Sequence, residues 1–156
     1  MFKQLHADRL IKLAEHLEGG KLGLEWDFGQ CRNVTNTTRL FRKPICKTVG
    51  CAIGDCATVF GKEWGEPVIN WHQGQIQGMA FFGLNHNEFL TMFYGARKID
   101  EVGKLCAFNL PRLPYTASPF EVARQIRSFV PLKLASLENP QERQATLVEC
   151  SSQPTE

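Results

Sequence analysis

The chain lacks several features that would assign it to a well-known class of protein. No apolar run approaches the roughly 20 residues with which a helix crosses a membrane. The opening residues, Met1 to Asp8, mix charged and apolar side chains without an apolar core, so we expect no signal peptide. No internal repeat and no low-complexity block is present. We therefore expect a globular cytoplasmic protein that has no membrane partner.

Three further absences concern chemistry. The glycine patterns of Walker-type and dinucleotide-binding loops are missing. No close Cys-x2-Cys pair occurs, although the chain has six cysteines, and without an export signal we expect these to be reduced thiols. The net charge is only +2, so nucleic acid is possible as a partner but is not favoured.

What is present fits one domain. A chain of 156 residues, 43% of them hydrophobic, is long enough to bury a core without disulfides or metals. The composition turns polar near Glu138, so we predict a single globular domain over residues 1–137 and a flexible polar tail over 138–156.

Helical spacing and capping residues predict most of the elements. Residues 2–18 form an amphipathic pattern that Gly19 and Gly20 end. Residues 49–60 fit a helix with Thr48 as N-cap, and their small side chains favour a central, buried position. Shorter helices are expected over 76–82 and 97–108, with short extended pieces at 24–28 and 68–71.

Two helix starts carry capping boxes. Asn85 and Glu88 form the first, and the helix behind it is expected to end near Gly95. Ser118 and Glu121 form the second, and the helix behind it is expected to stop before Pro131. We expect a core of phenylalanines at positions 81, 82, 89, 93 and 120. The predicted fold is mainly α: a compact helical bundle around a central small-residue helix, with at most short β segments.

The most informative stretch is Cys46-Lys47-Thr48-Val49-Gly50-Cys51-Ala52-Ile53-Gly54. It resembles the Cys-Gly-Thr-x-x-Cys-x-x-Gly motif of a family of small uncharacterised proteins in phage and bacterial genomes. Other parts follow in the family's order: Leu13 to Glu18, Trp26, Phe82-Gly83-Leu84 and Ser118 to Ala123. Lys47 replaces the family's usual glycine. The resemblance covers about residues 5–130 and implies a phage or mobile-element origin, but it implies no reaction.

The segment around this motif is basic. From Phe28 to Gly54 there are five basic residues and no acidic one. The start of the 49–60 helix adds free N–H groups and the positive end of the helix dipole. We therefore predict a binding site for an anionic, nucleotide-like ligand or for a host protein, made of Arg39, Phe41, Arg42, Lys43, Lys47, Thr48 and Trp71. The alternative is that these charges only keep a loop solvated.

Two other interpretations of the same region remain open. In a cysteine-dependent hydrolase or transferase, Cys46 or Cys51 would be the nucleophile and His72 or His86 the base, oriented by Asn70 or Asn85. In a zinc site, the ligands would come from Cys31, Cys46, Cys51, Cys56, His72 and His86, although a spacing of five does not place three helical cysteines together. Buried cysteines such as Cys51 and Cys56 are most often simply core residues.

We favour a non-catalytic, cytoplasmic binding protein of phage type, which takes an anionic small ligand or a host protein and counters a host system. No cofactor is expected. Association into homo-oligomers stays open, because an exposed apolar helix face would suffice for it.

Overall fold

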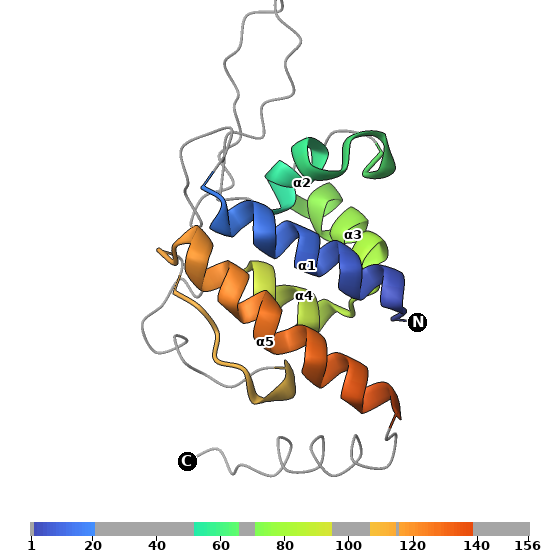
Figure 1. Ribbon diagram of the computed structural model, residues 1–156, viewed down its shortest axis with the longest axis vertical. Helices are drawn as coiled ribbons and strands as arrows, with labels where there is room; N and C mark the ends of the chain where they lie inside the picture. Colours follow the sequence, from blue (N-terminus) through green and yellow to red (C-terminus); the bar gives the residue numbers. More distant parts are fainter. Residues whose placement is uncertain (1, 21–51, 66–70, 95–106, 115, 139–156) are drawn as a thin grey trace, which may run out of the picture.

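The computed structural model describes residues 2–20, 52–65, 71–94, 107–114 and 116–138. Most of these residues lie in the α-helices of Figure 1: α1 (Gln4–Glu18), α2 (Ala52–Phe60), α3 (Trp71–Phe82), α4 (His86–Phe93) and α5 (Pro119–Glu138). Short 3-10 turns are formed by η1 (Gly61–Glu63) and η3 (Ala107–Asn109). Within the described ranges there is no strand, so the prediction of a compact, mainly α fold is confirmed. The predicted extended piece at 24–28, the 97–106 part of the predicted helix and the tail from 139 onward lie outside these ranges.

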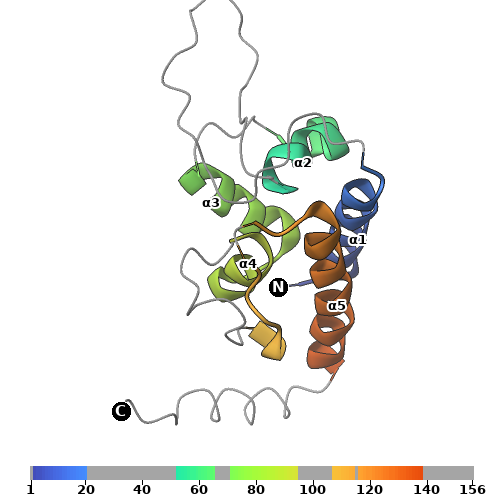
Figure 2. The same cartoon turned by 90° about the vertical axis from the view of Figure 1, so that its left-hand side faces the viewer.

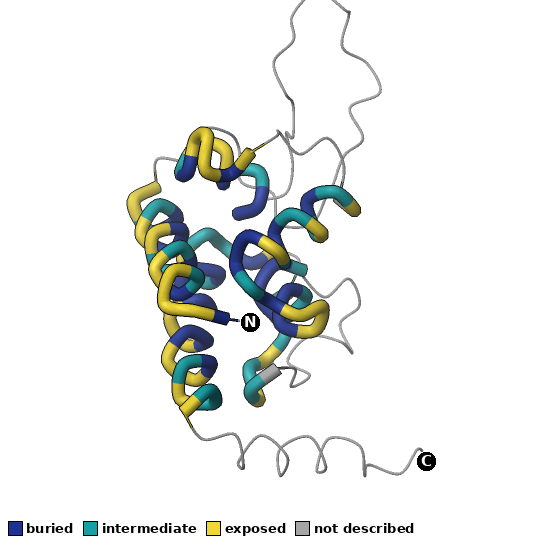
Figure 3. The backbone as a smooth tube through the Cα atoms, turned by 90° about the vertical axis from the view of Figure 1, so that its right-hand side faces the viewer, coloured by how far each residue is buried: buried dark blue, intermediate teal, exposed yellow. Residues whose placement is uncertain are grey.

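The main packing contact joins α1 and α5, which run antiparallel along one side of the molecule (Figure 1). Each helix presents an apolar stripe at helical spacing, and burial of these stripes removes apolar surface from water. The exposed residues face outward along both helices (Figure 3). The fully buried residues of the two stripes are Leu10, Leu13, Ala14 and Leu17 on α1, and Val122, Ala123, Ile126 and Phe129 on α5.

Helices α3 and α4 pack behind this pair and bring an aromatic cluster into the core (Figure 2). Its rings meet edge to face or tilted, with centroids 4.9 to 6.2 Å apart. The cluster comprises Phe60, Trp64, Phe81, Phe82 and Phe93. Gly78 allows a close approach of α3 to its neighbours, because a Cβ there would lie 2.6 Å from the Phe89 ring.

Helix α2 does not take the central place that the sequence predicts for residues 49–60. Its described part, Ala52–Phe60, lies at one end of the bundle and contacts α1 and α3 (Figures 1 and 2). Helix α1 is the one that touches α2, α3 and α5 together. The small residues of α2 still serve close packing, since Ala52 and Cys56 are buried there.

Polar contacts fix these helices at their edges. The Arg9 guanidinium on α1 donates to Glu63 and to the Phe81 carbonyl, and it stacks 3.9 Å over the Phe81 ring. At the other end of α1, Arg127 of α5 forms a two-point ion pair with Glu18, with both N–O distances 2.7 Å. Long-range pairs of this kind set the register of α1 against its neighbours, although each exposed pair stabilises the fold only slightly.

Both capping boxes are confirmed. The Asn85 side chain accepts from the Glu88 N–H at 2.9 Å, and Glu88 accepts from the Asn85 N–H at 3.0 Å. Ser118 and Glu121 make the same exchange at the start of α5. Helix α1 ends at Gly19 and Gly20 as predicted, with Gly20 in the left-handed region at φ +63°.

Helix α5 does not stop before Pro131, which corrects the sequence-based prediction. It continues to Glu138 with the proline on its exposed side. Residues on both sides of the proline, Val130 and Lys133, are buried against the rest of the bundle. This burial outweighs the loss of one helical hydrogen bond.

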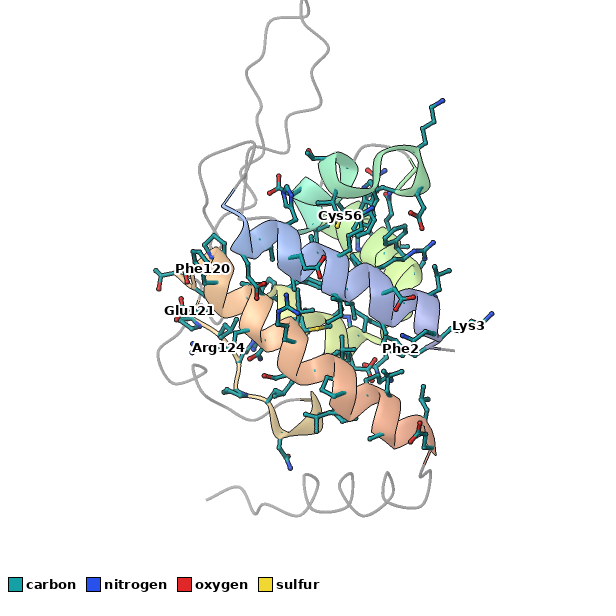
Figure 4. All side chains as sticks on the ribbon, viewed as in Figure 1. Phe2, Lys3, Cys56, Phe120, Glu121 and Arg124 are labelled. Carbon is teal, nitrogen blue, oxygen red and sulfur yellow. The ribbon has the colours of Figure 1, made fainter. Side chains whose placement is uncertain are left out.

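Three smaller predictions were also wrong. Phe120 is 61% exposed instead of buried, in the first turn of α5 (Figure 4). Trp71 begins α3 and is not extended. Phe108 does not continue a helix, since its φ of +59° is left-handed. The other four predicted core phenylalanines are buried.

Candidate functional site

Most of the predicted anion site lies outside the described residues. This holds for Arg39, Phe41, Arg42, Lys43, Lys47 and Thr48, and also for the candidate cysteines Cys31, Cys46 and Cys51. Trp71 is described only as the first residue of α3. The convergence of these side chains therefore stays a prediction.

The structure describes four residues of the thiol and zinc alternatives, and it gives each of them a role other than catalysis or metal binding or leaves it exposed. His72 is exposed on α3. His86 Nδ1 lies 2.7 Å from Gln75 Nε2, and Asn85 caps α4. Cys56 is fully buried and its thiol donates to the Ala52 carbonyl at 3.1 Å. Burial raises the pKa of the Cys56 thiol well above its ordinary value, and the Asp55 carboxylate raises this pKa further, so Cys56 is a core residue and not a nucleophile. Within the described ranges, no three His, Cys, Asp or Glu side chains are grouped so that they could hold a metal ion.

An open groove of about 660 Å³ lies where the start of α1 meets α3, α4 and the second half of α5. Figure 4 shows Phe2 and Lys3 at this end of α1, beside α5. Residues from five segments line it: Phe2, Lys3, His6, Met79, Ala80, Gly83, Leu84, Asn85, Glu88, Lys133 and Leu137.

A buried ion pair forms part of the groove wall. Lys133 Nζ of α5 lies 2.5 Å from Glu88 Oε1 of α4, and the two residues are only 4% and 2% exposed. Two rings also face the ammonium group: the Phe2 ring centroid lies 5.8 Å from Nζ and the Phe108 centroid 5.7 Å. The charge is thus held at one place in a wall of mixed polar and apolar character.

A second hydrogen bond holds the Glu88 carboxylate in place. Its other oxygen, Oε2, accepts from the Asn85 backbone N–H in the capping box of α4. If the carboxylate swung away, the Asn85 N–H would lose its acceptor, while Asn85 Oδ1 would still accept from the Glu88 N–H. Lys133 has three N–H donors, and among the described residues only Glu88 accepts from it. Within the part of the chain that the structure describes, no further group accepts from its other two N–H donors.

His6 also lines the groove. Its Nδ1 accepts from the Lys3 backbone N–H at 2.9 Å. Burial lowers the pKa of His6, and the positive charges of Arg9 and Lys3 lower it further. The ring packs directly on Gly83, where a Cβ would collide with Nδ1 and its neighbouring ring carbons. Gly83 also has a left-handed φ of +63°, which favours glycine, and a Cβ here would in addition force the His6 ring to shift.

The groove combines apolar side chains with charged and polar ones. Phe2, Met79, Leu84 and Leu137 supply the apolar surface. Among the lining residues Lys3 and Lys133 carry positive charges and Glu88 a negative one, and the N-terminal ammonium adds a further positive charge that acts on His6. Of these charged groups, Glu88 and Lys133 pair with each other, and Glu88 also accepts from the Asn85 N–H.

Sequence reasoning did not find this site, although one signal was available. Lys133 follows Ile126 and Phe129 at spacings of seven and four, so it falls on the buried stripe of α5. A lysine on such a stripe requires a buried partner. The predicted helix stop at Pro131 removed Lys133 from consideration. Glu88 was recognised, but only as a capping residue.

Comparisons with protein-family models, with curated proteins and with solved structures gave no match. The resemblance to phage and bacterial proteins through residues 46–54 therefore remains a prediction from the sequence. Within the described ranges, no helix combines the length and the apolar character needed to cross a membrane.

Proposed function

We propose that this chain is a non-catalytic binding protein and that the groove between α1, α3, α4 and α5 captures a small anionic ligand. One observation carries the proposal: the buried Lys133 ammonium lines the groove wall and uses one of its three donors on Glu88. A buried charge whose hydrogen bonds are incomplete favours an added acceptor, and a ligand anion supplies one.

The basic segment predicted from the sequence enters the same proposal as a second contact region. Its charges, at Arg39, Arg42, Lys43 and Lys47, would attract an anion or an acidic surface of a host protein. Action in the cytoplasm of a bacterial host is proposed on the family resemblance of residues 46–54. The cysteine-enzyme and zinc alternatives rest on cysteines outside the described residues, so neither is put forward.

Native mass spectrometry of the purified protein, beside its denatured mass, tests the proposal. We expect an excess native mass that corresponds to a small anion, either retained from the expression host or added from a panel of metabolite anions. A native mass equal to one chain or a clean multiple, unchanged by every anion of the panel, contradicts the proposal.

Paired variants then locate the bound anion. Lys133→Met with Glu88→Gln removes the groove's ion pair while it keeps the groove's net charge, because one charge of each sign is lost. Arg42→Ala with Lys47→Ala removes two charges of the basic segment. The groove proposal expects the first pair to abolish the added mass and the second to preserve it. The reverse result would place the site in the basic segment.

A further inference from the structure

We infer that His6 is a pH-sensitive latch: its neutral ring holds the start of α1, residues 2–6, against the groove, and protonation of the ring releases this segment. The inference goes beyond the proposed function, because it concerns a movable wall of the groove and not the occupant. It follows from three observations: the hydrogen bond that the neutral ring makes, the charges around the ring, and the few contacts that hold residues 2–6.

The hydrogen bond at the start of α1 requires a neutral ring. Lys3 is the N-cap residue of α1, and His6 is the third residue of the helix. The His6 Nδ1 atom accepts from the Lys3 backbone N–H at 2.9 Å, so this nitrogen carries no proton. A protonated imidazole has two N–H donors and no acceptor. Protonation would therefore turn one N–H group toward another, and the Lys3 N–H would lose its partner.

Charges on the same helix oppose protonation of the ring. Burial lowers the pKa of His6 most, and Arg9, the N-terminal ammonium and Lys3 each lower it further. Glu63 of η1 pairs with Arg9, yet the Arg9 charge still acts on this pKa. The first turn of a helix also carries the positive end of the helix dipole, which disfavours a cation there.

The other helices do not compensate these charges. Among the described elements packed against the ring, none offers it an unpaired carboxylate. Gly83, which follows α3, lies directly beside the ring and carries no charge. Glu88 of α4 lines the groove, but its carboxylate already pairs with Lys133 and accepts from the Asn85 N–H. Lys133 of α5 is a further positive charge in the same lining, so a protonated His6 is more stable in water than in this position.

Few contacts hold the start of α1 to the rest of the molecule (Figure 4). Residues 3–5 are exposed, and the buried stripe of α1 begins only at Ala7. Apart from His6, the segment reaches the core through Phe2, which is 5% exposed and meets the Phe129 ring with the two centroids 6.4 Å apart. Release of His6 therefore leaves Phe2 as the remaining core contact. Opening would withdraw both residues from the groove lining and would stop where the buried stripe begins.

The test is an NMR titration of the full chain, without ligand, from about pH 8 downward until the core unfolds. The ring carbons of His6 report its protonation, and the ¹³Cα shifts of residues 4–6 report whether they are helical. We expect residues 4–6 to lose their helical shifts together with the titration of His6, below about pH 6.5, while residues 10–17 keep theirs. Each pH unit below that value should raise the ratio of open to closed chain by up to about tenfold, because the open form binds the proton more tightly.

Variants separate the latch from other effects of acid. His6→Gln keeps an acceptor for the Lys3 N–H at the usual place in a capping box but does not titrate, so residues 4–6 should stay helical in acid. Phe2→Leu weakens the remaining core contact and should move the midpoint of opening up toward the ordinary histidine pKa of about 6.5. His72→Gln, at an exposed position of α3, is the matched control and should keep the midpoint of the unaltered chain.

Three results would overturn the inference. The first is a His6 ring that becomes protonated while residues 4–6 stay helical. The second is a segment that stays helical until residues 10–17 unfold. The third is the same loss of helical shifts in His6→Gln, because another group would then drive the opening. Since no ligand is present, these results do not depend on what the groove binds.

Discussion

At the scale of single residues, Gly83 is the position where the groove and the fold constrain the sequence most directly. Its left-handed backbone disfavours any residue with a Cβ, and that Cβ would also strike the His6 ring. Gly20 has the same φ of +63°, but a Cβ added there would have nothing within 4 Å. A substitution at Gly20 therefore measures the backbone strain alone, without the collision.

We expect Gly83→Ala to lower the free energy of unfolding by about 2–4 kcal/mol, through left-handed strain and overpacking together. Gly20→Ala should lower it by only about 1–2 kcal/mol, since strain acts there alone. Urea unfolding monitored by circular dichroism measures both. Equal losses in the two variants would show that His6 moves aside at no cost.

The ion pair between Glu88 and Lys133 predicts that substitutions at the two positions have strongly non-additive effects on the free energy of unfolding. Lys133→Met alone leaves a buried carboxylate without its partner and should cost about 3–5 kcal/mol of stability. The double variant with Glu88→Gln should recover most of this loss, because no unpaired charge remains. A double-mutant cycle from denaturant unfolding gives the coupling free energy. Additive losses would mean that the two side chains do not depend on each other.

His6 makes stability depend on pH in one direction. Because the pKa of His6 is lowered in the folded protein, the unfolded chain binds more protons below about pH 6.5. Its contribution to stability is therefore present above that pH and is lost as the pH falls toward the folded pKa. His6→Asn, which keeps an acceptor for the Lys3 N–H, should flatten this part of the stability profile. His72→Asn, at an exposed position, is the control, and an unchanged slope in His6→Asn contradicts the prediction.

At the scale of elements, the caps could be predicted from the sequence and the end of α5 could not. Asn85 with Glu88, and Ser118 with Glu121, are local exchanges between residues three apart, so four letters of sequence determine them. The end of α5 depends on burial of Lys133 against Glu88, 45 residues away. No local rule contains that contact, and the local rule about proline therefore gave the wrong boundary.

Replacement of Pro131 tests how far packing overrides the local rule. Proline in the interior of α5 removes one N–H donor, whereas Pro119 lies in the first turn where that donor has no helical partner. We expect Pro131→Ala to raise the free energy of unfolding by about 1–2 kcal/mol, less than the full interior penalty because proline also restricts the unfolded chain. Pro119→Ala should change it by less than about 0.5 kcal/mol. A loss of stability in Pro131→Ala would indicate that α5 needs its proline to bring Lys133 to Glu88.

At the scale of the whole molecule, the fold class was predictable because helical spacing and phenylalanine content indicate packed helices, whatever the arrangement of those helices. Their arrangement was not predictable. The small residues of 49–60 indicated a central helix, yet in the structure α1 contacts α2, α3 and α5 while α2 lies at one end. Small side chains permit close packing but do not say which neighbour comes close. The groove was likewise not predictable from the sequence, because its walls come from segments far apart in the chain.

Hydrogen exchange distinguishes a central α2 from a peripheral one. If α1 and α5 form the core of the molecule, amides such as those of Leu13 and Phe129 open only with global unfolding, because both residues are fully buried between the two helices. Helix α2 has nine residues and packs against α1 and α3 at one end of the bundle, so its amides near Cys56 should open at a free energy lower by at least about 1 kcal/mol. Exchange rates measured residue by residue by NMR, under conditions where the rate rises with pH, give these opening free energies. If the amides of α2 exchange as slowly as those of α1, then α2 unfolds together with the core, as the central helix expected from the sequence would.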